Sequence, residues 1–306
     1  MNGLRYENIS CWRKWKNSNY KCFTGGQNGI RRYLNYDNIP CGESRHWIYD
    51  VTSPEKENEG VFSWGRSLER RGGYDPIIKE YRPYILESFY YCDADTERLL
   101  PYFGDFMLDS GAFTFMNNMP KKEINWDEYI ERYADFINRN KVNKYFELDI
   151  DKVVGYERVK EYRRILENKV NKQCIPVWHK NRGIEEFKKH CQEYPYVSIG
   201  GYVVKELTPK DYEAFPAMIK YAHLNNAKIH CLGFTKLDSL SKYHFDSVDS
   251  TAWTTGNRFG YIYKFDGVTM RKIEPPRGYR LGDSKKVALI NYIEWIKFQK
   301  YAEMHL

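Results

Sequence analysis

The sequence predicts an α/β protein built as a (β/α)₈ TIM barrel, with an N-terminal extension and with a hairpin plus a helix at its C-terminus. From about residue 80 onward, short apolar runs alternate with amphipathic helical patterns. Strict alternation of strand and helix indicates parallel strands joined by right-handed crossovers. The chain has 306 residues, of which 42% are hydrophobic, enough for one large core. We expect an extension over residues 1–75 and a barrel with a C-terminal helix over residues 76–306.

Seven strands are predicted as short apolar runs bounded by polar or turn-forming residues. They cover residues 84–91, 105–108, 144–150, 173–178, 196–199, 228–233 and 245–248. A run over residues 45–51, which contains Trp47, Ile48 and Tyr49, could supply the eighth strand of a closed barrel. A doubly wound open sheet is the alternative, and it is disfavoured because no glycine-rich dinucleotide motif follows an early strand.

Helices are predicted between the strands from apolar residues spaced three and four apart. They cover residues 126–140, 156–169, 184–194, 209–225 and 236–243. After the last strand, residues 260–265 and 267–273 are predicted to form a hairpin around Asp266-Gly267, a dipeptide typical of tight turns. Residues 284–304 have the pattern of a terminal amphipathic helix. Its predicted packing stripe consists of Val287, Ile290, Ile293, Trp295 and Ile296.

The composition indicates a reducing compartment and a phosphate-rich partner. The chain carries 48 basic and 41 acidic residues, and the net charge of +7 suits a nucleic acid better than an acidic protein. The seven cysteines are odd in number and show no paired framework. No apolar stretch approaches the roughly 20 residues that span a bilayer, and the N-terminus lacks the apolar core of a signal peptide. We therefore expect a cytoplasmic protein without a membrane partner.

Polar residues stand at the carboxyl ends of the predicted strands, where a barrel places its active site. They are Glu87, Asp109, Ser110, Asp149, Asp151, His179, Gly200, Gly201, Gly233, Asp246 and Asp249. Several carboxylates in one mouth repel one another unless they bind the donors of a ligand or share protons. A guanine-like base offers such donors at N1 and at its exocyclic amine. The alternative is that each acid caps the helix that follows its strand.

Four motifs follow one another over roughly residues 100–260. The first is Asp-Ser-Gly-Ala-Phe-Thr at residues 109–114, and the others cover residues 197–206, 231–234 and 245–258. The ordered set resembles the tRNA-guanine transglycosylase family. The corresponding family motifs are Asp-Ser-Gly-Gly-aromatic-Gln, Ile-Gly-Gly…Gly-Glu, Leu-Met-Gly-Val and Val-Asp-x-Phe-Asp-Cys-Val-x-Pro-Thr-Arg-Asn-Gly-Arg. The resemblance implies a barrel enzyme that exchanges a base on a polynucleotide.

The resemblance also implies which carboxylates carry the chemistry. Asp249 would be the nucleophile that attacks the ribosyl anomeric carbon and forms a covalent glycosyl-enzyme. Two inversions at that carbon would retain its configuration. Asp109 would act as acid and base on the departing and incoming bases, and Ser110 would assist it. Asp246 would support the site, or would be a buried, hydrogen-bonded carboxylate.

The edge of the base would be bound by residues from several strand ends. Asp149 would accept hydrogen bonds from the guanine-like edge, and Gly200 and Gly201 would let the backbone approach the base and donate to its carbonyl oxygen. His179 stands where the family has a glutamine. Its ring could still donate to a base carbonyl. The alternative is a neutral histidine that is hydrogen-bonded at a strand end.

Two apolar side chains would hold the faces of the base. Phe113 and Leu232, with Gly233 in the turn after Leu232, would sandwich it by stacking. The sequence departs from the family here, because Ala112 replaces the second glycine of the first motif and Thr114 replaces its glutamine.

A zinc site is missing from the pattern. The family has Cys-x-Cys-x-x-Cys…His after the nucleophile motif, whereas no cysteine follows Cys231 in this chain. We therefore expect neither a metal nor another cofactor. This form resembles divergent transglycosylases of bacteriophages and genomic islands that place 7-deazaguanines in DNA. Arg258, together with Arg13 and Lys14 near the N-terminus, would contact backbone phosphates, although a solvated surface also explains such basic runs.

The sequence thus predicts a guanine transglycosylase that inserts a 7-deazaguanine base into DNA, with base flipping where the target is a duplex. Exchange on tRNA is the first alternative, and action on another modified macromolecule in defence is a second. A homodimer stays open. A noncatalytic barrel that binds a modified base belongs to a different class, and the presence of both Asp109 and Asp249 favours catalysis over it. An unrelated barrel hydrolase would need a metal cluster that the scattered histidines do not supply.

Overall fold

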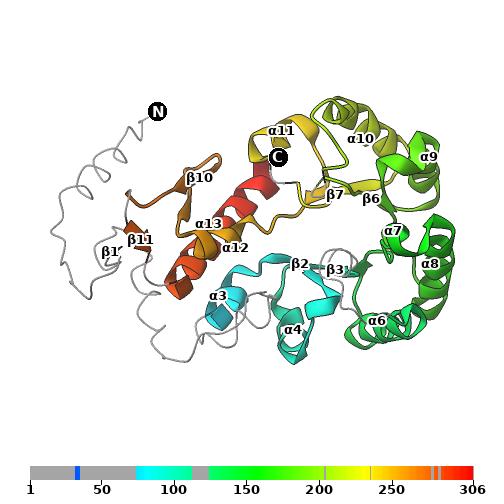
Figure 1. Cartoon of the computed structure of the whole chain (residues 1–306), viewed down its shortest axis with the longest axis horizontal. Coiled ribbons are helices and arrows are strands. Elements are labelled where there is room, and N and C mark those ends of the chain that lie inside the picture. Colours follow the sequence, from blue (N-terminus) through cyan, green and yellow to red (C-terminus); the bar gives the residue numbers. More distant parts are fainter. Residues whose placement is uncertain are drawn as a thin grey trace.

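Short parallel strands follow one another in chain order in the computed structural model, which describes residues 32–34, 74–111, 124–202, 205–234, 236–276, 279–281 and 284–305 (Figure 1). The strands are β2 (Tyr84–Ser88), β3 (Asp105–Asp109), β4 (Lys144–Tyr145), β5 (Val177–Trp178), β6 (Tyr196–Ile199), β7 (Lys228–Cys231) and β8 (Ser247–Val248). They form one sheet of order β2-β3-β4 and one of order β5-β6-β7-β8. A parallel bridge between Phe146 and Ile175 continues the order from one sheet to the next. The predicted α/β class with parallel strands is confirmed.

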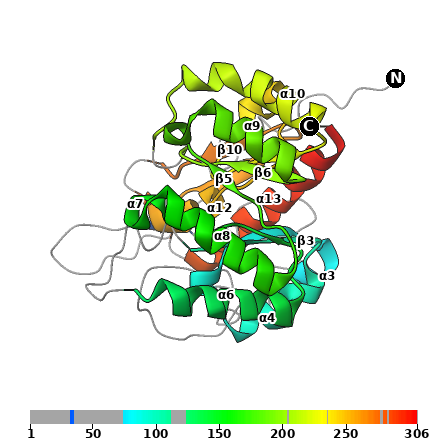
Figure 2. The ribbon, with the colours of Figure 1, turned by 90° about the vertical axis from the view of Figure 1, so that its right-hand side faces the viewer.

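Helices connect the strands and lie along their outer side (Figures 1 and 2). They are α4 (Ala94–Leu99), α6 (Trp126–Asn140), α7 (Asp151–Val154), α8 (Tyr156–Val170), α9 (Gly183–Glu193), α10 (Phe215–Leu224) and α11 (Leu240–Tyr243), and α3 (Tyr74–Tyr81) precedes β2. Helix α6 begins where the side chain of Asn125 accepts a hydrogen bond from the N–H of Glu128, and it ends at Lys141 in the left-handed conformation. Each crossover returns the chain to the same edge of the sheet, so the strands run parallel.

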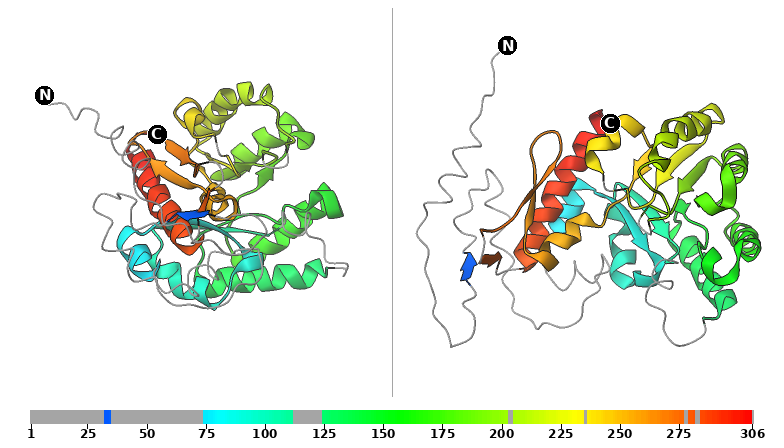
Figure 3. Two further views of the ribbon diagram at one scale, coloured as in Figure 1. Left: turned by 60° about the vertical axis from the view of Figure 1, so that its left-hand side comes forward. Right: turned by 45° about the horizontal axis from the view of Figure 1, so that its top comes forward.

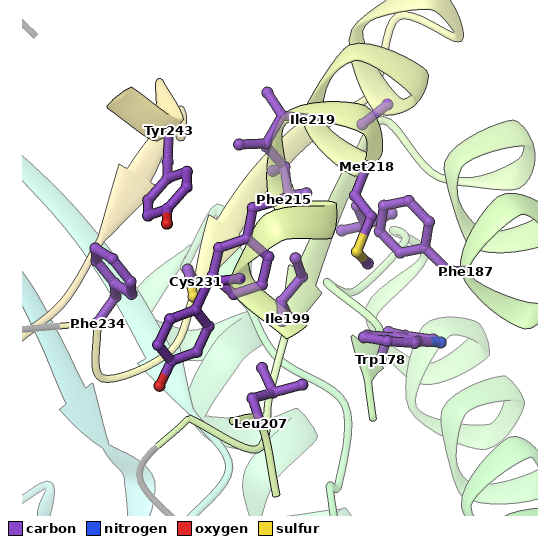
Figure 4. Packing of buried hydrophobic residues seen from close by; sticks show 14 of the residues in the cluster. Trp178, Phe187, Ile199, Leu207, Phe215, Met218, Ile219, Cys231, Phe234 and Tyr243 are labelled. Carbon is purple, nitrogen blue, oxygen red and sulfur yellow. The ribbon is translucent and has the colours of Figure 1, made fainter. Parts of the chain in front are cut away.

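Side chains alternate between two faces along each strand. On β6 and β7, Val197, Ile199, Ile229 and Cys231 belong to the core cluster that packs against α9 and α10, part of which Figure 4 shows. The residues between them therefore point to the opposite face, which we call the inner face. A second cluster on the inner face unites Met107, Phe146, Ile175 and Val177, with Leu86, Tyr196 and Leu232 packed against it. The inner face consequently collects side chains from β2 to β7.

The C-terminal part packs across the start of the strand series. Helix α12 (Ala252–Phe259) is followed by the antiparallel pair β9 (Ile262–Phe265) and β10 (Met270–Ile273), which confirms the predicted hairpin. Helix α13 (Ser284–His305) runs beside α12 and this hairpin (Figure 3). The short strand β1 (Arg32–Leu34) pairs in parallel with β11 (Tyr279–Leu281). None of the helices in the described part of the chain is long and apolar enough to cross a membrane.

Several predicted elements differ from the observed ones. Strands β4 and β5 are shorter than the predicted runs, and the helix predicted over residues 209–225 is divided into the 3₁₀ turn η6 (Asp211–Ala214) and α10. The structure adds α12, which was not predicted. The predicted eighth strand over residues 45–51 lies outside the described residues. Among the described strands, no ladder joins β8 to β2.

Candidate active site

Three aspartates lie at the carboxyl ends of strands β3, β4 and β8. Asp109 is the last residue of β3, Asp249 directly follows β8, and Asp149 follows the short strand β4. Parallel strands bring their carboxyl ends to one edge of the sheet. The charges of Asp149 and Asp249 both act on Asp109, so the structure brings the three predicted site residues together.

The Asp109 carboxyl group has a pKa close to neutral, as a group that transfers protons near neutral pH requires. Burial raises its pKa to about 6 from the ordinary value of 3.8, and the charges of Asp149 and Asp249 add to the rise. The N–H of Gly111 opposes this rise by donating to Oδ2 of Asp109 at 2.9 Å. Gly111 has a φ of +84°, which a residue with a side chain rarely adopts. The glycine of the Asp-Ser-Gly motif therefore allows the turn that holds the carboxylate.

Two serine hydroxyls lie beside Asp109. Ser110 is 1% exposed, and its carbonyl accepts a hydrogen bond of 2.6 Å from the hydroxyl of Tyr129. Ser88 stands opposite Asp109 in the register of β2 and β3. Among the described residues, neither serine Oγ has a hydrogen-bond partner. Buried polar atoms are rarely left unpaired, so both hydroxyls are candidates for contact with a ligand. Ser110 was predicted at this site, whereas Ser88 was not.

Among the described residues, the side-chain bonds of Asp249 all go to one oxygen atom. Its Oδ1 accepts a hydrogen bond of 2.6 Å from the N–H of Gly233 and lies 3.2 Å from Nε2 of His230. The His230 ring belongs to β7 and is 1% exposed. The sequence places His230 two residues before Leu232, on the inner face of a strand, but that pattern alone did not mark it as a partner of Asp249. Gly233 thus contributes its backbone to the site.

His179 lies between two carboxylates. Its Nε2 is 2.7 Å from Oδ2 of Asp149, and its Nδ1 is 2.8 Å from Oε2 of Glu206. Burial lowers the pKa of His179, but the hydrogen bonds to Asp149 and Glu206 outweigh this effect and raise it to about 9. The ring is therefore a cation at neutral pH, and it donates from both nitrogens. No ring nitrogen is left for the base carbonyl that the sequence suggested as its acceptor.

Arg182 connects this pair to the core. Its Nη2 lies 3.1 Å from Oδ1 of Asp149, and its Nη1 lies 2.9 Å from Oε1 of Glu147. Asp149 therefore uses one oxygen for His179 and the other for Arg182. In this arrangement protein groups already bond the carboxylate that was predicted to accept from the guanine-like edge. Arg182 also approaches Oδ2 of Asp151 at 3.3 Å, so the second acid of this turn has a partner within the protein as well.

Glu147 is the buried end of this network. It is 0% exposed and accepts hydrogen bonds from Nε of Arg163 at 2.6 Å and from the N–H of Val177 at 2.9 Å. Burial alone would raise its pKa, but Arg163 and Arg182 bring the pKa below the ordinary value. Neither Glu147 nor Arg182 was predicted as part of the site. Their contacts depend on which strands become neighbours, and sequence spacing does not show this.

The Gly200-Gly201 pair makes room for the His179 network. A Cβ atom on Gly200 would lie 2.8 Å from Cε1 and Nε2 of His179. A Cβ atom on Gly201 would lie 2.9 Å from Oε2 of Glu206, and Gly201 has a φ of +83°. The sequence suggested close approach of a base at these glycines. In the structure, the ring of His179 and the carboxylate of Glu206 fill that space.

Asp246 lies at the opposite end of its strand from Asp249. Its Oδ2 accepts hydrogen bonds of 2.8 Å from the N–H of Ile229, near the start of β7, and from Nε2 of His223. The structure therefore does not bring Asp246 to the carboxyl-end cluster, and its observed role is to join β7 to the segment before β8. A shallow surface pocket between α10 and α11 also includes His223, so it belongs to this opposite end.

The structure describes only some of the remaining predicted site residues. Leu232 packs against the inner-face cluster, next to Gly233 in the turn after β7. Phe113, Arg13 and Lys14 lie outside the described residues, and Arg258 belongs to α12 without a described side chain. Within the described ranges, no group of three or more His, Cys, Asp or Glu side chains is placed to hold a metal ion.

Neither a model of a known protein family nor a protein of curated function matches this chain. We therefore base the functional proposal on the arrangement of Asp109, Asp249 and their neighbours, together with the ordered motifs in the sequence.

Proposed function

We propose that this protein is a glycosyltransferase that exchanges guanine for a 7-deazaguanine base in DNA. The observation that carries the proposal is the contrast between two neighbouring carboxylates. Asp109 has a pKa raised to about 6, chiefly by burial, whereas Asp249 is held at Oδ1 by Gly233 and His230. Carboxylates with such different surroundings can divide the roles of acid and nucleophile between them.

We also infer that the strands belong to a closed (β/α)₈ barrel. The parallel strands from β2 to β8 follow chain order, and the inner-face cluster contains side chains from strands of both sheets. In a barrel, inward side chains fill the centre and the carboxyl ends of the strands form the active site. Closure between β8 and β2 would need a further strand, for which residues 45–51 are the candidate in the sequence.

The first half of the reaction forms the covalent intermediate. Oδ2 of Asp249 attacks the anomeric carbon C1′ of the target nucleotide, and the bond from C1′ to the base nitrogen breaks with its electron pair on the base. Asp109 in its protonated form gives the base a proton, so that the base leaves as a neutral molecule. The products are an aspartyl ester of the sugar, free guanine and the Asp109 carboxylate.

The second half reverses these events with a different base. The incoming 7-deazaguanine gives the proton of its reacting nitrogen to the Asp109 carboxylate, and this nitrogen attacks C1′. The bond between C1′ and Oδ2 of Asp249 then breaks, and the carboxylate is regenerated. Each half inverts the configuration at C1′, so the nucleotide keeps its original configuration. A pKa near neutral suits Asp109 for both directions of transfer.

Recognition of the base needs groups that the protein has not already paired. The hydroxyls of Ser88 and Ser110 meet this condition among the described residues, whereas Asp149 and His179 bond each other. Phe113 and Leu232 are proposed as the faces that stack on the base. DNA is favoured over tRNA by the resemblance to zinc-free transglycosylases, and the net charge of +7 suits either polymer. Arg258, Arg13 and Lys14 are proposed phosphate contacts.

A base-exchange assay tests this function. Duplex DNA, single-stranded DNA and unmodified tRNA are incubated with the protein and radiolabelled guanine, and label in the polymer is measured. We expect incorporation into DNA and none with Asp249→Asn, while the covalent adduct with DNA appears on denaturing gels only with Asp249 present. Asp246→Asn is the matched control, because it changes a nearby acid that bonds to Ile229 and His223 at the opposite strand end. It should keep exchange.

Each other outcome points to a different function. Label in tRNA alone would replace DNA by tRNA as the substrate. Undiminished exchange in Asp249→Asn would remove Asp249 as the nucleophile. Binding of DNA without exchange in any polymer, and without an adduct, would indicate a noncatalytic protein that holds a modified base.

A further inference from the structure

A chain of hydrogen-bonded polar groups leads away from Asp249, and it consists of the buried ring of His230 and the half-buried side chains of Ser247 and Tyr196. Nε2 of His230 is 3.2 Å from Oδ1 of Asp249, and Nδ1 of the same ring is 2.5 Å from Oγ of Ser247. The hydroxyl of Tyr196 lies 2.5 Å from the same Ser247 oxygen. These residues come from β6, β7 and β8, and each occupies an inner-face position of its strand. The chain therefore runs from the carboxyl end of β8 along the inner face to Tyr196 at the start of β6.

Hydrogen bonding fixes where the protons of this chain lie. An ionised carboxylate only accepts, so the ring must carry a proton on Nε2 in order to bond Asp249. With a neutral ring, Nδ1 then accepts from Ser247, and the Ser247 oxygen accepts from Tyr196. Every donor in this arrangement has an acceptor. If both ring nitrogens carried protons, Ser247 would donate to Tyr196. The Tyr196 O–H would then have no acceptor among the described residues, and an unsatisfied donor costs free energy.

We propose that His230 is a positioning residue for Asp249, with its ring fixed as the neutral Nε2–H form by the one-way chain from Tyr196 through Ser247. The ring and the N–H of Gly233 both bond Oδ1, and among the described residues no hydrogen bond reaches Oδ2. Oδ2 is thereby left as the attacking oxygen. The role in attack rests on the proposed function, whereas the proton arrangement does not depend on it.

The same two donors also serve the second half of the reaction. When Oδ2 is bonded to the sugar, Oδ1 is the carbonyl oxygen of the ester. As the C1′–Oδ2 bond breaks, negative charge returns to the carboxylate. Donors already aimed at Oδ1 stabilise this charge without rearrangement, in the manner of an oxyanion hole. The Phe146 ring helps to hold the His230 ring in place, because the two rings pack edge to face with 5.4 Å between their centroids.

Nitrogen NMR of the histidine rings tests the proton arrangement directly. The protein is produced with ¹⁵N-labelled histidine, and the His230 signals among the seven histidines are assigned by their loss in His230→Gln. We expect a neutral Nε2–H ring at pH 7. Ser247→Ala removes the donor to Nδ1 while Asp249 still requires the proton on Nε2, so the Nδ1 signal should move toward that of a protonated nitrogen. A ring protonated on Nδ1, or on both nitrogens, in the unchanged protein would overturn the proposal.

Ser198→Ala is the matched control for Ser247→Ala. Ser198 pairs with His230 in the register of β6 and β7, is 0% exposed and, among the described residues, has no partner for its Oγ. Each variant thus removes a serine hydroxyl from an inner-face position beside His230, but only Ser247→Ala removes a hydrogen bond to the ring. The His230 signals should be unchanged in Ser198→Ala. An equal effect of both variants would show a general packing effect and overturn the role of Ser247.

Kinetics then test the consequence for Asp249. His230→Phe keeps a ring against Phe146 but removes the donor, and it should lower kcat for adduct formation on the order of 10²-fold with KM unchanged. His230→Gln retains an N–H donor and should recover part of this loss. Wild-type kcat in His230→Phe, measured on folded protein, would overturn the positioning role. Failure of the unchanged protein to form any adduct would instead count against the proposed function and leave the NMR result valid.

Discussion

The ring of His179 and the carboxylate of Asp149 form an ion pair, with 2.7 Å between Nε2 and Oδ2. This pair brings a cation into an edge of the sheet that otherwise gathers acids. Arg182 bonds the second oxygen of Asp149, and Glu206 bonds the second nitrogen of His179. The negative charges of this cluster are therefore largely balanced within the protein, and Asp109 is left as the acid whose proton is free to move.

His179 should make the folded state more stable at neutral pH than at alkaline pH. Its pKa is about 9 in the folded protein and 6.5 in the ordinary case, so the folded state binds the proton more tightly. The stabilisation is fully present below pH 6.5 and is lost as the pH rises through 9, roughly 3 kcal/mol in all. Urea unfolding of the wild type and of His179→Gln at about pH 6, 7.5 and 9.5 measures this stabilisation, because the range spans both pKa values. A stability difference that stays constant with pH would contradict this prediction.

Glu147→Gln should be strongly destabilising. The substitution removes the negative charge that compensates Arg163 and Arg182, whose side chains are 7% and 2% exposed. Breaking a buried pair in this way lowers the free energy of unfolding by about 3–5 kcal/mol. Glu161→Gln is the matched control, because Glu161 pairs with Arg158 at the surface, and its loss should change stability by less than about 1 kcal/mol. Equal urea midpoints for the two variants would show that the Glu147 network contributes little.

Gly200→Ala should displace the His179 ring. The added Cβ would lie 2.8 Å from Cε1 of His179 and from Cγ1 of Val177, closer than van der Waals contact. We expect a loss of about 1–3 kcal/mol in the free energy of unfolding, as for other overpacked sites. A double-mutant cycle with His179→Ala checks the cause. Part of the loss should disappear in the His179→Ala background, while the contact with Val177 remains, and strict additivity would mean that His179 is not the affected group.

The sequence predicted the elements whose signals are local. Helix α6 and strand β6 have the bounds that their apolar periodicity indicated. Strand β4 is shorter than predicted because Leu148 and Ile150 are buried in the core without pairing as a strand, and apolar runs do not distinguish these two situations. Helix α12 was missed because its sequence favours no helix by itself. It is stabilised by packing, since its Gly256 lies against Asn291 of α13 so closely that a Cβ would come within 2.1 Å of Nδ2.

The candidate site shows the same division. Asp109 and Asp249 could be placed from sequence because strand ends and motif order are both visible along the chain. The bonds of Asp149 to His179 and Arg182 join residues about 30 positions apart, and they depend on the lateral order of β4, β5 and β6. Glu206 was part of a motif, but its contact with His179 becomes visible only when Gly200 and Gly201 are placed in space.

Asp109 should lower the stability of the folded protein at the pH where it is needed for proton transfer. Its pKa is about 6, above the ordinary 3.8, so between these values the folded state binds more protons than the unfolded state. Stability therefore falls as the pH rises from about 4 to 6, by roughly 3 kcal/mol at most. Asp109→Asn mimics the neutral carboxyl group. It should abolish base exchange and, above pH 6, raise the free energy of unfolding by up to about 3 kcal/mol.

Thermal and urea unfolding of wild type and Asp109→Asn at pH values below and above this window check the sign. The two proteins should have nearly equal stability at acidic pH and should diverge as Asp109 ionises. Asp246→Asn provides the contrast, because the carboxylate of Asp246 accepts two hydrogen bonds, from Ile229 and His223, and losing its charge should not stabilise the fold. If Asp109→Asn were instead destabilising at alkaline pH, the Asp109 carboxylate would be well bonded in its ionised form. It would then hold no readily transferred proton and could not serve as the acid for the departing base.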